Sequence, residues 1–176
     1  MNQSDVAEKQ KPLRAKYRSS PETAMVTDHA RTSGTDPRDP FHSRVEPMDG
    51  CGVTVPVGVH AGVGGLHDAP TPGDILCAAL AACQDSTIRM VADLLGVELE
   101  HLEVEVTADA DLRGTLGMER DVPVGFQAIR CSVRMRAKEG TSPAILEKLK
   151  GSAEHCCVVQ QTLRNPPPVR TTFSVD

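Results

Sequence analysis

The stretch that decides how this chain folds is Thr71-Pro72-Gly73-Asp74-Ile75-Leu76-Cys77-Ala78-Ala79-Leu80-Ala81-Ala82-Cys83. Thr71 is suited to cap a helix, Pro72 suits the first helical position, and Asp74 supplies the acidic partner of a capping box. Gly96 ends the pattern, so we expect a helix of about 24 residues, roughly 36 Å long. Its many alanines favour close packing against another helix.

The rest of the chain carries strand signals and a second helix. Alternation of apolar and polar residues predicts strands within residues 53–59, 102–107, 129–136 and 169–175. Pro56 should place the first of them at a sheet edge, because proline cannot donate a ladder hydrogen bond. The second helix is expected to begin after Ser142-Pro143 and to reach Cys157. This order predicts an α+β fold with helices on one face of a largely antiparallel sheet.

The amino-terminal part differs in composition from the rest of the chain. Residues 1 to about 40 are rich in charged residues, Ser, Thr and Pro and show no sustained period, which is typical of a mobile segment. We therefore expect residues 1–45 to form an arm that is mobile or that covers a partner subunit. Residues 46–176 are expected to form one domain, and 176 residues with 39% hydrophobic content suffice for a core.

Composition restricts the function. Nineteen Lys and Arg against 24 Asp and Glu give a formal charge of −5, and without a basic run this argues against a nucleic-acid partner. No run of eighteen apolar residues occurs, and no apolar stretch follows a positive region at the amino terminus. We therefore expect a soluble cytoplasmic protein with no membrane partner. Its six cysteines are then expected to be thiols rather than a structural disulfide framework.

Two helical cysteines are the candidates for chemistry. A thiol is a fast nucleophile only as a thiolate, which needs a positive neighbour, a helix amino terminus or hydrogen bonds to sulfur. Cys83 lies about three turns from its own helix start, beyond the reach of the helix dipole. Arg89 is about 240° around the same helix and cannot activate it within one chain. Arg44 is a candidate activating residue, and Arg14 and Arg18 are others.

Every one of these cysteines also has a purely structural interpretation. A buried free cysteine is most often a small core side chain, and Cys51, Cys77 and Cys131 are assigned that role. Cys156 and Cys157 are adjacent and point about 100° apart in a helix, so only one can face Cys83. A zinc site of His155, Cys156 and Cys157 with His60 and His67 matches no standard ligand spacing.

Three arginines on the strand within residues 129–136 have two possible roles. Arg130, Arg134 and Arg136 share one face of that strand. They are interpreted as a solvated or salt-bridged face, with anion binding as the alternative.

Several short motifs are spread over the chain, namely Pro72 with Ile75-Leu76, Ala78 to Cys83, Thr87 to Met90, Asp111 to Gly117, Gly125-Phe126, Ala153 to Cys157 and Thr162-Leu163. Taken together they resemble the OsmC/Ohr family of organic hydroperoxide resistance proteins. The resemblance covers residues 50 to about 175. It implies an intertwined homodimer, with two long central helices packed between largely antiparallel sheets and two active sites at the subunit interface.

The resemblance also implies an activity and its residues. In the family's peroxidases the cysteine that matches Cys83 is oxidised by an organic hydroperoxide to a sulfenic acid. The one that matches Cys157 then forms a disulfide with it. An external dithiol of the lipoyl type reduces that disulfide, and no bound cofactor is expected. The small-molecule partner would be a hydroperoxide or another apolar ligand.

Two positions depart from the family pattern. The peroxidases carry a glutamate after the matching proline, which helps to hold an arginine against the reactive sulfur. Here that position is Gly73, with Asp74 next as a possible substitute. The family proline after the second cysteine is Val158. These departures motivate an alternative, an OsmC-like small-molecule-binding or redox-sensing protein with little turnover, and a third possibility in which the cysteines only pack the helices.

Overall fold

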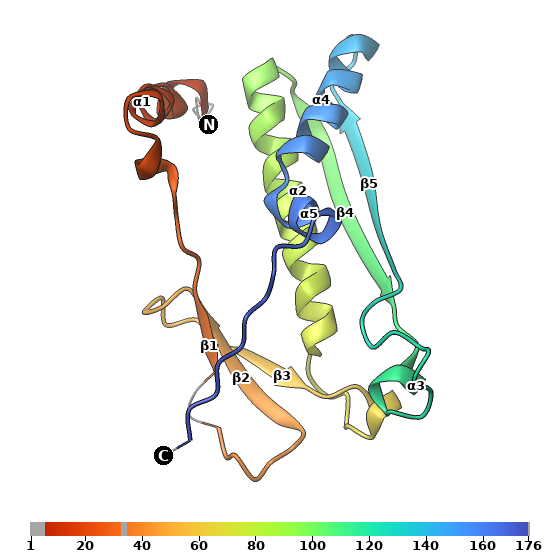
Figure 1. Cartoon of the computed structure of the whole chain (residues 1–176). Helices are drawn as coiled ribbons and strands as arrows, with labels where there is room; N and C mark the ends of the chain where they lie inside the picture. The colour runs from red at the N-terminus through yellow and green to blue at the C-terminus, as the bar shows by residue number, and fades with distance from the viewer. Residues whose placement is uncertain (1–5, 33–34, 176) are drawn as a thin grey trace.

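The structure is a computed structural model that describes residues 6–32 and 35–175 (Figure 1). Its elements are α1 (Val6–Ser19), η1 (Pro21–Ala24), β1 (Ala30–Thr32), β2 (His42–Pro47), β3 (Val55–Gly58), η2 (Ala61–Val63), α2 (Pro72–Leu95), β4 (Leu99–Asp109), α3 (Leu112–Thr115), β5 (Ala128–Ala137), α4 (Pro143–Cys156) and α5 (Val158–Arg164). The predicted α+β class is confirmed.

Helix α2 begins and ends where the sequence predicts. The Thr71 hydroxyl accepts a hydrogen bond from the Asp74 backbone N–H at 3.2 Å, and the Asp74 carboxylate accepts from the Thr71 N–H at 2.8 Å, which completes the capping box. At the other end Gly96 has φ 65°, in the left-handed region that favours glycine, and its N–H bonds to the carbonyls of Ala92 and Asp93. The predicted 24-residue helix is confirmed.

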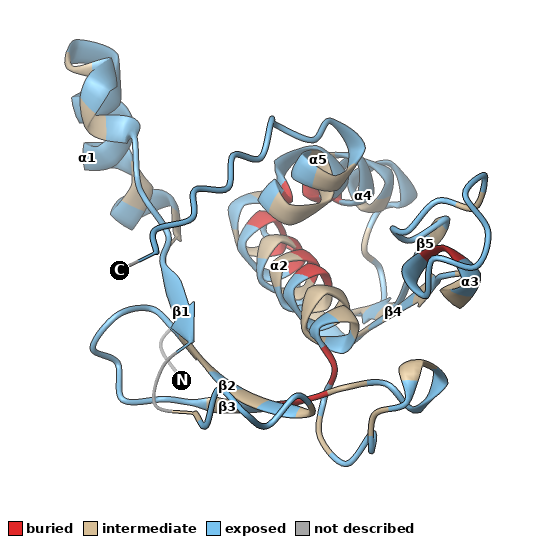
Figure 2. Ribbon diagram, turned by 60° about the horizontal axis from the view of Figure 1, so that its bottom comes forward, coloured by how far each residue is buried: buried red, intermediate tan, exposed pale blue. Residues whose placement is uncertain are grey.

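The hydrophobic core lies between α2, α4 and the antiparallel pair β4–β5. Its buried members are Ile88, Val91, Ala92, Val97, Leu149 and Ala153. Figure 2 shows that the buried positions of α2 face α4 and α5, while much of the rest of the helix is exposed. The alternation predicted for β4 is also observed, because Leu102, Val104 and Val106 are half-buried and the residues between them are exposed.

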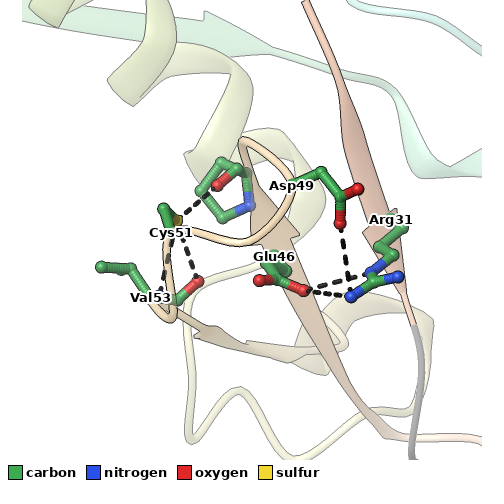
Figure 3. A network of polar contacts seen from close by, with 6 residues as sticks. Arg31, Glu46, Asp49, Cys51 and Val53 are labelled. Atoms are coloured by element: carbon green, nitrogen blue, oxygen red, sulfur yellow. Dashed lines mark hydrogen bonds and ion pairs between the residues drawn. The ribbon is translucent and has the colours of Figure 1, made fainter.

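Strands β1, β2 and β3 form a separate antiparallel sheet in that order. Pro56 lies on β3, at the predicted edge. Arg31 of β1 binds the Glu46 carboxylate of β2 at 3.0 Å and Asp49 at 3.4 Å (Figure 3). In the turn after β2, the Cys51 thiol donates to the Pro47 carbonyl oxygen at 3.0 Å.

The arginine face of β5 is salt-bridged to β4. Arg130 pairs with Asp109 at 2.7 Å, Arg134 with Glu103 at 2.7 Å, and Arg136 with Glu100 at 3.0 Å. All these side chains are exposed, so each pair contributes little to stability. Because each arginine already has a carboxylate partner, this face supports the salt-bridged interpretation over anion binding.

Two predictions about the ends of the chain differ from the structure. Residues 169–175 do not form a strand, and Val169, Phe173 and Val175 are about nine-tenths exposed. A strand requires a neighbour to accept and donate its ladder hydrogen bonds, and within the described residues this segment has none.

The amino-terminal region contains regular structure that its composition did not predict. It includes helix α1 and strands β1 and β2, and β2 crosses the expected boundary after residue 45. Strand pairing with β3 supplies order that local composition does not encode. Residues 1–5 and 33–34 of the expected arm lie outside the described residues, and the mobility of the arm stays a prediction.

The single chain exposes a large surface for its mass. Its accessible area is 13297 Å² at 18.8 kDa, whereas a compact monomer of that mass is expected to expose about 8,300 Å². The excess arises because the two sheets do not pack face to face and the central helix is covered on one side (Figures 1 and 2). Within the described residues, α2 alone is long and apolar enough to span a membrane, a property that central helices of soluble proteins share.

Candidate functional site

The structure brings Cys83 and Cys157 together at the point where α4 ends and α5 begins. Helix α4 ends at Cys156, and Cys157 adopts an extended conformation (φ −72°, ψ 104°) before α5 begins at Val158. This break turns Cys157 inward, where it is fully buried, and leaves Cys156 exposed. The Cys157 thiol hydrogen-bonds to Cys83 on α2, so the expectation that only one of the adjacent pair faces Cys83 is confirmed.

Cys83 is held in an environment that favours its thiolate. Burial raises the pKa of the Cys83 thiol, but hydrogen bonds from the Val159 N–H, the Cys157 thiol, the Thr87 hydroxyl and the Val158 N–H outweigh it and lower the pKa below its usual value. The two N–H groups belong to the first turn of α5, where backbone donors have no partner within the helix. The Cys83 residue is half-buried.

The surroundings of Cys157 shift its pKa in the opposite direction. Burial, together with the neighbouring Cys83 and Cys131 sulfurs, raises the pKa of the Cys157 thiol to about 11, although the Gln160 N–H acts in the other direction. Of the two contacting sulfurs, Cys83 therefore forms a thiolate more readily than Cys157 does.

The donors to Cys83 are the functional groups that sequence reasoning missed. The sequence places Cys83 too far from the start of its own helix, and it gives no register between α2 and a helix that begins 75 residues later. The sequence did contain one relevant signal, which is Val158 at the position where the family resemblance leads one to expect proline. Proline has no backbone N–H, whereas valine has one that can donate to the sulfur.

The other proposed supporting residues lie elsewhere in the single chain. Asp74 is occupied as the capping partner of Thr71. Arg44 is exposed on β2, opposite Pro56 of β3. Among the described residues no guanidinium contributes to the lowered pKa of Cys83.

Arg89 and the arginines of α1 do not place a positive charge beside the Cys83 sulfur either. Arg89 is paired with Asp85 at 2.7 Å, which agrees with its exclusion as an activating residue. Helix α1 is anchored near the far end of α2, where the Val6 N–H donates to the Asp93 carboxylate at 2.9 Å. That point is about 15 Å along α2 from Cys83.

Gly73 lies close to the aromatic ring of Phe126. A Cβ atom at this position would come within 2.9 Å of Phe126 Cζ, closer than side chains tolerate. The family's glutamate therefore cannot be accommodated here unless Phe126 moves. Gly73 is also about 15 Å along α2 from Cys83, so a side chain at 73 cannot reach the sulfur of its own chain directly.

A wide cavity of about 1190 Å³ lies beside the first half of α2 and does not include Cys83. Asp74, Cys77 and Ala81 line it, together with Phe126. Cys83 lies about 200° around the helix from Ala81, on the opposite face. Burial raises the pKa of Cys77, so this thiol is less reactive than Cys83. Within the described residues no group of three or more His, Cys, Asp or Glu side chains is placed to hold a metal ion.

The fold and this site define a class of α+β proteins in which a long capped helix carries one thiol and the break between two shorter helices presents another. The chain belongs to the OsmC-like protein family, whose family model matches residues 65–172. No curated protein matches the sequence.

Solved structures with the same fold have low sequence identity to this chain. An organic hydroperoxide resistance protein OsmC from Legionella pneumophila is 21% identical, with a TM-score of 0.59 over 80% of this chain and 91% of that one. An OsmC-like protein of unknown function from Vibrio cholerae is 13% identical, with a TM-score of 0.63 over 78% and 94%. An organic hydroperoxide resistance protein from Elizabethkingia anophelis, crystallised with thiocyanate, is 18% identical, with a TM-score of 0.58 over 81% and 91%. At these identities the likeness establishes the fold.

Proposed function

We propose that the protein is a thiol-dependent peroxidase that reduces organic hydroperoxides. The observation that carries the proposal is the contact of the buried Cys157 thiol with Cys83, whose sulfur also accepts hydrogen bonds from the N–H groups of Val158 and Val159. These contacts lower the pKa of Cys83, whereas burial raises that of Cys157. The names of the solved relatives from Legionella pneumophila and Elizabethkingia anophelis point to the same substrate class.

The proposed reaction has three steps. The Cys83 thiolate attacks the terminal oxygen of the hydroperoxide, the O–O bond breaks, and the departing alkoxide takes a proton to leave as an alcohol. The Cys157 thiol gives up its proton and attacks the Cys83 sulfenic acid, so that an S–S bond forms and water leaves. An external dithiol of the lipoyl type then reduces the disulfide by two successive thiol exchanges.

The hydrogen bonds from α5 are suited to the first step. They lower the pKa of Cys83 and so raise the fraction of its thiolate, which is the nucleophile of this step. Keeping Cys157 protonated leaves the first sulfur as the only strong nucleophile until it has been oxidised. The second thiol can then attack at contact distance, which limits further oxidation of the sulfenic acid by more peroxide.

We infer that the working unit is a homodimer. The accessible area of the single chain exceeds that of a compact monomer by more than half, as the scaling with mass shows. The exposed apolar positions of 169–175 have no partner in the described chain. Arg44 and the large cavity beside α2 are available to a second subunit, which could supply the cation that Cys83 lacks in one chain.

The experiment that tests the activity follows oxidation of the reduced protein by excess cumene hydroperoxide. Because the chain has no Trp, quenched-flow alkylation with peptide mass spectrometry is a better readout than fluorescence. We expect fast, stoichiometric formation of a Cys83–Cys157 disulfide. Cys83→Ser should abolish peroxide consumption, and Cys157→Ser should accumulate sulfenic and then sulfinic acid at Cys83. Cys156→Ser is the matched control, because Cys156 is exposed and should not affect the rate.

A second candidate function is favoured by one observation, the glycine at position 73 packed under Phe126. In that case the protein binds a small apolar ligand or senses oxidants with little turnover. A peroxide reaction no faster than that of a free thiol would favour this second function. Unchanged turnover in the Cys83→Ser variant would rule out the proposed peroxidase mechanism.

A further inference from the structure

Two buried glutamine side chains beside the thiol pair each have an atom without a hydrogen-bond partner. Gln84 follows Cys83 directly on α2 and is only 6% exposed, and its Oε1 atom has no partner among the described residues. Gln160 lies three residues after Cys157 on α5, and its Nε2 atom is likewise buried without a partner in the described chain. Neither atom has appreciable accessible surface, so solvent does not satisfy it. Buried polar atoms of this kind are costly to the fold and require an explanation.

The two atoms need opposite kinds of partner. The Oε1 atom of Gln84 accepts a hydrogen bond, and the Nε2 atom of Gln160 donates one. Both side chains line one depression between α2, β5, α4 and α5. Helix α5 packs against α2, as Figures 1 and 2 both show. A small displacement of α5 towards α2 would therefore let the two amides bind each other, with no ligand between them.

Oxidation of the thiol pair supplies such a displacement. In the reduced chain the Cys83 sulfur accepts hydrogen bonds from the N–H groups of Val158 and Val159, which hold the first turn of α5 in place. A disulfide carries no thiolate charge, so these contacts weaken when it forms. The two sulfurs also come to about 2.05 Å from each other, closer than two hydrogen-bonded thiols lie. Because Cys157 immediately precedes α5, the new bond draws that helix towards α2.

We propose that Gln84 and Gln160 are positioning residues for the disulfide step, and that their amides bind each other when Cys83 and Cys157 are oxidised. The inference deepens the proposed function and rests on its disulfide. The hydrogen bond between the amides is present in the disulfide form and absent from the dithiol form, so it stabilises the first relative to the second. It therefore favours attack of Cys157 on the Cys83 sulfenic acid over further oxidation of that acid by peroxide.

The test measures the thiol–disulfide equilibrium of the full chain in mixtures of reduced and oxidised dithiothreitol. The two cysteine thiols give two electrons and two protons to oxidised dithiothreitol, which becomes the dithiol while the Cys83–Cys157 bond forms. Alkylation and peptide mass spectrometry give the ratio of the two forms. Gln84→Met and Gln160→Met keep the length of each side chain and remove its amide. We expect each variant to shift the equilibrium towards the dithiol by about fivefold or more, the effect of one buried hydrogen bond.

A double variant distinguishes a direct contact from two separate effects. If the amides bind each other, the variant with both methionines should shift the equilibrium by the same factor as either single variant, because each one already loses the contact. Two separate effects would multiply. In the ¹⁵N-labelled chain the side-chain amide signals of Gln160 should move on oxidation, and Gln84→Met should abolish that change. Gln127→Met, at an exposed glutamine outside the depression, is the matched control and should behave as the unaltered chain does.

Three outcomes would overturn the inference while leaving the proposed function in place. They are an unchanged equilibrium in both methionine variants, a double variant whose factor is the product of the single ones, and Gln160 amide signals that do not respond to oxidation. Backbone spectra establish whether each variant is folded, and two single variants keep the test decisive if one is not. Diamide oxidises thiols without peroxide, so a chain that forms no Cys83–Cys157 bond with diamide lacks the disulfide itself, and both proposals then fail.

Discussion

The backbone N–H of Val158 donates a hydrogen bond to the sulfur of Cys83, and this contact joins the first turn of α5 to the middle of α2. Its neighbour Val159 does the same. Proline, which the resemblance to the family led us to expect at position 158, has no N–H to donate. Valine at this position therefore supplies a backbone donor to the sulfur.

Val158→Pro removes that donor with little other disturbance. Proline is well tolerated at the first position of a helix, and the Val158 side chain is 70% exposed, so the fold should be retained. We expect the pKa of Cys83 to rise and its alkylation by iodoacetamide at pH 7 to slow by up to about fivefold, as the loss of ~1 kcal/mol implies. Val158→Ala keeps the N–H and is the control. Equal rates in both variants would show that the contact does not activate the sulfur.

The alkylation rates of Cys83 and Cys157 should depend differently on pH. Only the thiolate reacts, so the rate at Cys83 should rise with pH and level off above its pKa, which lies below the ordinary thiol value of 9.0. Cys157 should stay unmodified until the pH approaches its pKa of about 11. Peptide mass spectrometry after short pulses distinguishes the two sites. Modification of Cys157 before Cys83 at neutral pH would contradict the assignment.

The depressed pKa of Cys83 also affects stability. Because the folded state holds the thiolate better than the unfolded state does, its contribution is present above the unfolded pKa and is lost as pH falls through the folded pKa. Cys157 has the opposite sign, since its raised pKa contributes stability below 9 that is lost as pH rises through about 11. Cys157→Ala should therefore flatten the alkaline limb of a stability profile measured by urea unfolding.

Restoring the family glutamate requires the Phe126 ring to shift, because the new Cβ of Gly73→Glu would lie 2.9 Å from Phe126 Cζ. Gly73→Glu with Phe126→Ala removes that clash, and we expect peroxide turnover to rise above that of Phe126→Ala alone if a second subunit supplies an arginine. The comparison uses steady-state peroxide consumption. A double variant no faster than Phe126→Ala would show that the glutamate has no function in this protein.

The long helix could be predicted because its signals are local, whereas the pairing of Cys83 with Cys157 was expected from the family resemblance. The capping residues Thr71 and Asp74 bond to each other across one turn, and Gly96 ends the helix by its own conformation. The donors at Val158 and Val159 could not be predicted, because they depend on how α5 packs against α2. The strand expected within residues 169–175 has the right alternation, but pairing needs a neighbour that the described chain does not provide.

Leu149 is the residue whose truncation should cost the most stability. It is fully buried in the core formed with Ile88, Val91 and Ala153. Leu149→Ala should lower the free energy of unfolding by about 2–5 kcal/mol, because it removes apolar contacts and leaves a cavity. Ile145→Ala on the same helix is the control and should cost less, since Ile145 is 39% exposed. Urea unfolding of both variants measures the difference.

The exposed carboxy-terminal segment gives the sharpest test of the proposed homodimer. Phe173 is 87% exposed, so Phe173→Ser should hardly change the stability of a monomer. If this segment pairs with a second subunit, the substitution should instead weaken the dimer at least tenfold, because burial of a phenylalanine is worth about 1.5–3 kcal/mol. Phe173→Leu keeps an apolar side chain and should preserve most of the affinity. Sedimentation velocity over a concentration series measures all three chains. Equal self-association of the serine variant and the unaltered chain would exclude the segment from the interface, and a monomer at every concentration would exclude the dimer itself.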